Sequence, residues 1–155
     1  MKLRTTDLPG VALLEPRIYA DAPGFFYESS NKRTSHELQI GAEQATTGHR
    51  GEVFDVVVDL RRPSPSFGKH VALRLSAERP QMLWVPPGFA LGFAALSPYA
   101  EMLYKMTDYY APQHERTLLW NNPALNITWP LASALLLSAK DAAGIPLALA
   151  RGYAG

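Results

Sequence analysis

Residues 51–60 read GEVFDVVVDL, and this stretch is the clearest strand in the chain. Its side chains alternate between two faces, as successive residues of a strand do. One face is apolar and carries Phe54, Val56, Val58 and Leu60. The other face is mixed and carries two valines and two aspartates: Val53, Asp55, Val57 and Asp59. The alternation predicts one face on a core and one in a polar cavity or solvent. The preceding residues 42–50, AEQATTGHR, are small and polar, which indicates a turn-like connection.

Outward from this strand, 13 prolines and 11 glycines punctuate many short segments, which favours an all-β sandwich or barrel. Strands are predicted at Val11–Tyr19 (bent at Pro16), His70–Ser76, Met82–Val85, Phe89–Leu96 and Met102–Tyr110, with a turn at Pro63–Gly68 and an extended piece at Leu125–Trp129. Short helical pieces are predicted at Asn31–Leu38, within Pro112–Trp120, and after Ser138, which is placed to cap a helix whose first turn contains Asp141.

Composition limits the possible functions. The 155 residues fit one domain spanning 1–155, with 47% hydrophobic and 19% charged residues. A net charge of +1 without a basic stripe gives nucleic-acid binding little support. The absence of cysteine excludes disulfides and thiolate metal sites. No secretory signal or membrane span is recognisable, so a cytoplasmic location is expected.

The four histidines, His36, His49, His70 and His114, show neither His-x-His nor helical i, i+4 spacing, so no metal site is predicted. Phosphate-binding glycine loops and a nucleophile elbow are also absent from the sequence.

Two residues admit both a structural and a chemical role. Tyr104 alternates with apolar residues on its predicted strand, and a core tyrosine with a satisfied hydroxyl is one interpretation. A tyrosine with a pKa of about 10 is also protonated at neutral pH and can act as a general acid. Asp141 is either a helix-start carboxylate or a group that orients a histidine base.

Several segments in order resemble the dTDP-4-dehydrorhamnose 3,5-epimerase family. They are GFFYE at 24–28, GEVFDVVVDLRRPSPSFGKHVALRLSAE at 51–78, QMLWVPPGFALGFAALSPYAEMLYKMTDYYAPQHE at 81–115, then LLWNNPALNITWP and LSAKDA. The resemblance implies a cupin-type antiparallel jelly roll with a few short peripheral helices, in a barrel that the shortened stretch before Gly51 can leave incomplete. It also implies a homodimer that uses no metal or cofactor.

The family acts on a dTDP-linked 4-keto-6-deoxysugar, exchanging protons at the carbons beside the keto group. A base takes a proton from one face, donors stabilise the enolate oxygen, and an acid returns a proton to the opposite face. By resemblance, Tyr104 is the proton donor and Asp141 supports the histidine base. Glu115 and Lys140 bind substrate, Glu28 binds the nucleotide, and Phe26 is placed to stack on thymine.

Three departures from the family pattern are visible. Pro23 stands where the family has an arginine for the phosphates, and Leu91 stands where it has a site histidine. Residues 29–50 contain neither the family's base histidine nor its substrate arginine and oxyanion lysine. His49 is predicted to be a solvated loop residue rather than a replacement base.

Two hypotheses therefore remain: an epimerase of reduced or restricted activity, or a degenerate paralogue that binds a sugar nucleotide or a partner epimerase without turnover. The shortened stretch also predicts open strand edges, or a dimer partner that covers them.

Overall fold

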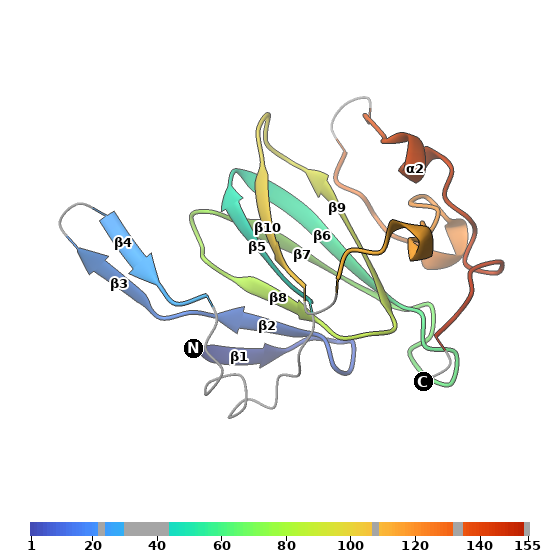
Figure 1. Cartoon of the computed structure of the whole chain (residues 1–155), viewed down its shortest axis with the longest axis horizontal. Helices are drawn as coiled ribbons and strands as arrows, with labels where there is room; N and C mark the ends of the chain where they lie inside the picture. The colour runs from blue at the N-terminus through green and yellow to red at the C-terminus, as the bar shows by residue number, and fades with distance from the viewer. Residues whose placement is uncertain (22–23, 30–43, 107–108, 132–134, 154–155) are drawn as a thin grey trace.

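The computed structural model describes residues 1–21, 24–29, 44–106, 109–131 and 135–153. Two antiparallel sheets face each other, and a separate hairpin projects from them (Figure 1). The larger sheet has the order β1-β2-β8-β5-β10, with bounds Lys2–Thr5, Ala12–Glu15, Met82–Val85, Gln44–Arg50 and Glu101–Lys105. The smaller has the order β7-β6-β9, with bounds His70–Ser76, Glu52–Asp59 and Phe89–Ala95. The hairpin is β3 (Ile18–Asp21) with β4 (Gly24–Tyr27).

The predicted all-β class is confirmed, and the two sheets do not close into a barrel. Within the described part of the chain, β9 ends one sheet and β10 ends the other. These two edge strands are consecutive along the chain, and Phe93 of β9 lies against Tyr104 of β10. One side of the sandwich is therefore open between β9 and β10, which agrees with the expectation of open strand edges.

Residues 44–50 correct one prediction. They form β5, which pairs with β8 on one side and β10 on the other, instead of a turn-like connection. Two flanking strands supply backbone partners, and this tertiary pairing outweighs the weak strand propensity of Gln, Ala and Gly. The chain crosses to the other sheet at Gly51, whose φ is +69°. A Cβ there would lie 2.1 Å from the Tyr99 carbonyl oxygen, so only glycine fits this corner.

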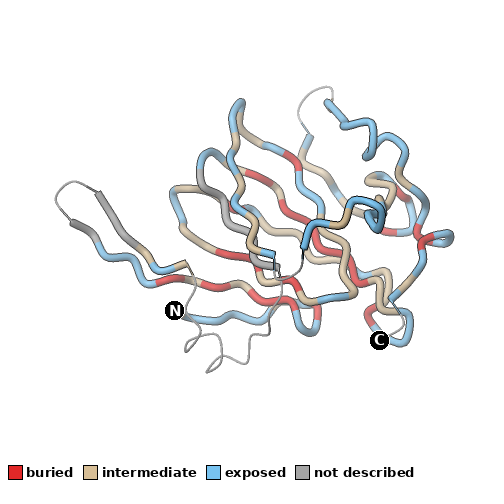
Figure 2. The backbone as a smooth tube through the Cα atoms, in the orientation of Figure 1, coloured by how far each residue is buried: buried red, intermediate tan, exposed pale blue. Residues whose placement is uncertain are grey.

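Both faces of β6 are buried, which corrects the prediction that its mixed face meets a polar cavity or solvent (Figure 2). The mixed face packs between the sheets in a first cluster, built on Leu8, Val11, Val53, Val57, Leu75, Leu83 and Val85. The apolar face packs under the C-terminal segment in a second cluster, built on Val56, Val58, Leu125 and Leu147. The segment that covers the apolar face follows β10 in the chain. The alternation of residues within β6 cannot show that such a distant segment packs on it.

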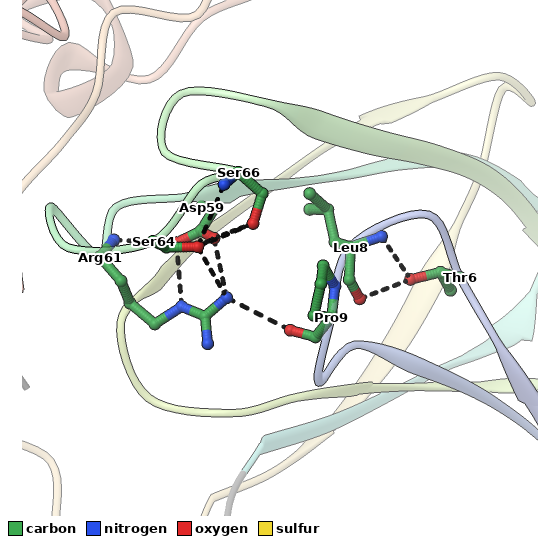
Figure 3. A network of polar contacts seen from close by, with 7 residues as sticks. All are labelled: Thr6, Leu8, Pro9, Asp59, Arg61, Ser64 and Ser66. Carbon is green, nitrogen blue, oxygen red and sulfur yellow. Dashed lines mark hydrogen bonds and ion pairs between the residues drawn. The ribbon is translucent and has the colours of Figure 1, made fainter.

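The fully buried Asp59 is satisfied by a polar network at the end of β6 (Figure 3). Arg61 Nη2 donates to Asp59 Oδ2 at 2.8 Å, and Arg61 Nε donates to Oδ1 at 3.0 Å. Ser66 and Ser64 hydroxyls donate to Oδ2 at 2.6 and 2.8 Å. Arg61 also donates to the Pro9 carbonyl and lies over the Phe89 ring, so the network joins the β1–β2 turn to the start of β9.

Most of the other predicted segments are confirmed: His70–Ser76 and Met82–Val85 have the predicted bounds, and the strand predicted at Phe89–Leu96 ends one residue earlier. Val11–Tyr19 is split by Pro16 into β2 and β3, and Pro63–Gly68 is a turn. A 3-10 turn forms at Pro112–His114, and the helix α2 spans Ala139–Ala142 with Ser138 as its N-cap. The Asn31–Leu38 helix lies outside the described residues.

Two segments were predicted wrongly. Strand β10 ends at Lys105 rather than Tyr110, because its ladder with β5 ends at the Lys105–Ala45 pair. The extended piece predicted at Leu125–Trp129 is wrong at its start, because Leu125 ends a 3-10 turn at Pro123–Leu125 and Asn126 has a left-handed backbone. Among the described residues, no helix is long and apolar enough to cross a membrane.

Candidate active site

A cavity of about 1000 Å³ runs along β9, and all seven residues of that strand line it. Tyr104 of β10 borders it on one side, and the C-terminal segment, including Trp120 and Trp129, borders it on the other. The cavity brings together three of the predicted site residues, Tyr104, Glu115 and Asp141. Lys140 is held beside it by an ion pair with Glu115. The open side of the sandwich and the candidate site are thus the same region.

Tyr104 is half-buried in this cavity. Its ring packs against Phe93 with ring centroids 6.3 Å apart. Burial raises the pKa of the Tyr104 hydroxyl, and the negative charge of Asp55 raises it further. The hydroxyl therefore keeps its proton well above neutral pH, and a protonated hydroxyl facing a cavity can donate that proton to a bound molecule.

Asp55 lies near the candidate site, and no role was predicted for it from the sequence. It is 1% exposed and lies opposite Phe93 in the β6–β9 ladder, on the face that looks toward Tyr104. Its position in the sequence could have indicated this role, because burying a carboxylate in the middle of a strand of valines costs free energy unless the charge is compensated. Its electrostatic effect on Tyr104 links the central strand to the cavity.

Glu115 and Lys140 form an exposed ion pair at the cavity mouth, which agrees with their predicted grouping. Lys140 donates a hydrogen bond to Glu115, and this bond lowers the pKa of Glu115 and raises that of Lys140. The hydroxyl of Tyr110, a residue that sequence reasoning did not single out, also bonds Glu115. Tyr110 is 78% exposed, so its ring is open to a ligand.

Asp141 sits in the first turn of α2. The Ser138 hydroxyl donates to Asp141 Oδ2 at 2.6 Å and accepts from the Asp141 backbone N–H at 3.1 Å. This is a helix-capping arrangement, the structural role weighed from the sequence. In the described part of the structure, no histidine lines the cavity with Asp141.

Glu28 is not among the described residues that line this cavity. The backbone of Phe26 belongs to β4, and its side chain lies outside the described part of the structure. Glu28 follows β4 and is exposed. Figure 1 shows the β3–β4 hairpin pointing away from the two sheets.

The departures from the family pattern can now be placed. Leu91 lines the cavity and also packs against the first cluster, so an apolar side chain occupies that position in the wall. His49 is a strand residue, not the loop residue that was predicted. The β5–β10 register shifts between Glu101, opposite Arg50, and Met102, opposite Gly48, which leaves His49 as the extra residue of a β-bulge.

Pro23 lies outside the described residues. Across the described ranges, no three His, Asp or Glu side chains are grouped as metal ligands would be.

The sequence and the fold have close counterparts among known proteins. The family model described as dTDP-4-dehydrorhamnose 3,5-epimerase matches residues 41–148. The Pseudomonas aeruginosa protein named dTDP-4-dehydrorhamnose 3,5-epimerase is 44% identical over 171 residues, covering 93% of this chain and 94% of that protein. That alignment is longer than the 155-residue chain, so the relative has positions that this chain lacks.

Two solved structures agree with this comparison. The dTDP-6-deoxy-D-glucose-3,5-epimerase of Legionella pneumophila, in complex with dTDP-4-keto-L-rhamnose, has a TM-score of 0.92 at 36% identity, covering 96% of this chain and 93% of that one. The Bacillus anthracis dTDP-4-dehydrorhamnose 3,5-epimerase, with TDP and PPi bound, has a TM-score of 0.84 at 34% identity, covering 90% and 95%. The resemblance seen in the sequence is confirmed, and the chain belongs to the dTDP-4-dehydrorhamnose 3,5-epimerase family.

Proposed function

We propose that this chain binds a dTDP-linked 4-keto-6-deoxysugar in the cavity along β9 and exchanges a proton on a carbon beside the keto group. The observation that carries the proposal is Tyr104, a half-buried tyrosine that lines the cavity and whose hydroxyl has a raised pKa. Hydrogens beside a ketone are acidic because the resulting carbanion is delocalised onto the oxygen. A positioned acid on one face of that enolate then sets the configuration of the product.

In this reaction a base removes a proton from the ring carbon and leaves an enolate whose charge rests on the former keto oxygen. Tyr104 donates its hydroxyl proton to the carbon from the face on which it lies, and the enolate returns to a ketone. The base releases its proton to water and Tyr104 recovers one from water, so both groups are restored before the next turnover. No redox step is involved. The burial that raises the pKa of Tyr104 keeps it in the protonated, donating form.

The charged and aromatic groups at the cavity mouth suit the nucleotide end of such a substrate. Lys140 and Arg116 are exposed cations close to the cavity, and a diphosphate attracts both. The exposed ring of Tyr110 offers a flat surface for a base beside these charges. We assign Glu115 the role of holding Lys140 in position through their ion pair.

Deuterium incorporation tests the enzymatic proposal. The chain is incubated with dTDP-4-dehydro-6-deoxyglucose in D₂O, and proton NMR follows the signals at C3 and C5. The expected result is loss of one or both signals faster than in a matched incubation with the Tyr104→Phe variant. Equal rates for the chain, the variant and a protein-free sample would refute the proposal.

A second candidate is binding without turnover, by a paralogue that has lost its chemistry. It is favoured by the lack of a cavity-lining histidine within the described residues, because proton abstraction needs a base. Calorimetric titration with thymidine diphosphate separates the two candidates. Binding of the nucleotide together with no deuterium incorporation supports the binding role, whereas incorporation above the Tyr104→Phe background contradicts it.

We further propose that the chain works as a homodimer in the cytoplasm. The hairpin that carries Phe26 and Glu28 points away from the cavity of its own chain (Figure 1). We infer from this direction that the hairpin presents these residues to a nucleotide in the cavity of another copy. Sedimentation equilibrium is expected to give twice the 17.1 kDa chain mass at micromolar concentration. A monomer under these conditions would exclude this arrangement. Subcellular fractionation tests the location.

A further inference from the structure

The short helix α2 brings Lys140 to the mouth of the cavity, where Lys140 pairs with Glu115 (Figure 1). A single helical turn is not stable by itself, so contacts at its two ends must hold α2 in place. At its start, the Ser138 hydroxyl accepts a hydrogen bond from the Asp141 backbone N–H at 3.1 Å. After its end, the chain passes through Gly144 and pairs with residues 117–119.

Gly144 lies where two backbone segments approach each other most closely. Leu119 N–H donates to the Ile145 carbonyl at 2.8 Å, and Ile145 N–H donates to the Thr117 carbonyl at 2.9 Å, which makes a short parallel bridge. A Cβ on Gly144 would lie 2.8 Å from Leu119 Cα and 2.9 Å from Leu119 N. Both are backbone atoms, which cannot turn aside as a side chain can. Any residue larger than glycine therefore has to push the two segments apart.

The parallel direction of this bridge places Glu115 and Lys140 on the same side of it. Glu115 comes shortly before Thr117 in one segment, and Lys140 comes one helical turn before Ile145 in the other. Since the two segments run in the same direction at the bridge, the residues before it extend back toward the same side. The Lys140–Glu115 ion pair forms there. The separation of the segments at Gly144 therefore sets the place of Lys140 relative to Glu115.

We propose that the close approach at Gly144, together with the Ser138 cap, positions Lys140 for the diphosphate of a nucleotide. Neither Gly144 nor Ser138 is among the described residues that line the cavity, so both act through Lys140. An exposed lysine side chain otherwise samples many rotamers. Holding its ammonium group beside Glu115 reduces the conformational entropy that is lost when a ligand binds. This inference rests on the role proposed above for Lys140.

A double-mutant cycle tests the coupling between Gly144 and Lys140. Calorimetry measures the affinity for thymidine diphosphate of the native chain, Gly144→Ala, Lys140→Met and the double variant. We expect Gly144→Ala to lower the affinity several-fold, and by no more than Lys140→Met does. In the Lys140→Met background, Gly144→Ala should cause no further loss, because the group that it positions is gone. An equal loss in both backgrounds, or no loss in either, would overturn the proposal.

Gly152→Ala is the matched control for loss of stability. A Cβ on Gly152 would lie 2.3 Å from Arg62 Cγ, and neither residue is among those described as lining the cavity. Circular dichroism first establishes that each variant folds, and calorimetry is done well below the lowest melting temperature. Gly152→Ala should keep the native affinity even where its melting temperature falls. A loss of affinity equal to that of Gly144→Ala would assign the effect to general destabilisation and overturn the proposal.

Ser138→Ala tests the other end of α2 and serves in place of Gly144→Ala should that variant not fold. Ser138 is exposed, so its replacement removes the helix cap without disturbing either core cluster. The affinity for thymidine diphosphate should again fall in the native background and stay unchanged in the Lys140→Met background. Additive losses from Ser138→Ala and Lys140→Met would contradict a positioning role.

The carboxyl group of Glu115 reports the position of Lys140 without any ligand. The hydrogen bond from Lys140 lowers the pKa of Glu115. Carbon NMR of labelled glutamate, with Glu115→Gln to assign the signal, should therefore show a higher Glu115 pKa in Gly144→Ala and in Ser138→Ala. An unchanged Glu115 pKa in both variants overturns the positioning. A raised pKa in a chain that binds no thymidine diphosphate supports the positioning of Lys140 and contradicts the proposed nucleotide site.

Discussion

Replacing Asp59 with asparagine tests whether the network at the end of β6 stabilises the fold. Asp59 is fully buried and accepts five hydrogen bonds, three from Arg61 and one each from Ser64 and Ser66. Asparagine has nearly the same shape but only one acceptor oxygen and no charge. The asparagine oxygen can keep the two hydrogen bonds that Oδ1 accepts, from the Arg61 backbone N–H and from Arg61 Nε. The asparagine NH₂ group replaces Oδ2 and cannot accept the hydrogen bonds that Oδ2 receives in the native chain.

The expected cost is about 3 kcal/mol of unfolding free energy at pH 7. A hydrogen bond to a charged group contributes about 1.5–3 kcal/mol, and removing one partner of a buried ion pair costs about 3–5 kcal/mol. The lower part of that range applies because Arg61 is partly exposed and the serine hydroxyls can rotate to accept from the new NH₂ group. Urea denaturation measures the difference, with Glu52→Gln as a control that breaks the exposed Glu52–Arg74 pair. The control should cost less than about 1 kcal/mol.

The cost should also depend on pH in a predictable direction. Burial alone would raise the pKa of Asp59, but the bonds from Arg61, Ser66 and Ser64 outweigh it and hold the pKa well below its ordinary range. The unfolded chain has an aspartate pKa of about 3.9. The stabilisation is therefore fully present above about pH 4 and is lost as the pH falls toward the folded pKa, by at most about 1.4 kcal/mol per pH unit.

The difference between the native chain and Asp59→Asn should accordingly shrink between about pH 4 and pH 2, because the asparagine does not titrate. Two results would refute the reasoning. One is a cost no larger than that of Glu52→Gln, and the other is a cost that stays constant down to pH 2.

Three further predictions concern the cavity and the packing around it. Tyr104→Phe keeps the ring against Phe93 but removes the hydroxyl proton, so deuterium incorporation should fall by about 10²–10⁴-fold with little change in melting temperature. Because the pKa of Tyr104 is raised, ionisation of Tyr104 should not lower the activity of the native chain up to about pH 10. Lys140→Met breaks an exposed ion pair with Glu115, so the affinity for thymidine diphosphate, measured by calorimetry, should fall several-fold while the melting temperature changes little. Unchanged affinity would remove Lys140 from the site. Gly144→Ala places a Cβ 2.8 Å from Leu119 Cα and should cost about 1–3 kcal/mol, whereas Gly92→Ala meets open space and should be neutral or stabilising in the same melts.

The elements that sequence reasoning predicted well are those in which local pattern and tertiary pairing agree. Strand β6 shows an alternating pattern and is the central strand of its sheet. Ser138 begins α2 as its capping position predicts. Strand β5 was missed because its partners β8 and β10 come later in the chain, and only they make a strand of residues with weak propensity. The extent of the domain, taken as 1–155, stays a prediction.

The candidate site shows the same division. Tyr104, Glu115, Asp141 and Lys140 were named from motifs, and the structure groups them at one cavity. Their roles stay predictions. Asp55 was missed because its effect on Tyr104 acts across two sheets, between residues 49 positions apart, and no local spacing reports such a contact.

The position of β6 has a consequence for how the molecule unfolds. Val53 and Val57 belong to the cluster between the sheets, and Val56 and Val58 belong to the cluster under the C-terminal segment. Neither cluster can lose its order without exposing the strand on which the other is built. The two cores are therefore a single cooperative unit, and loss of the C-terminal covering and separation of the sheets belong to one all-or-none event.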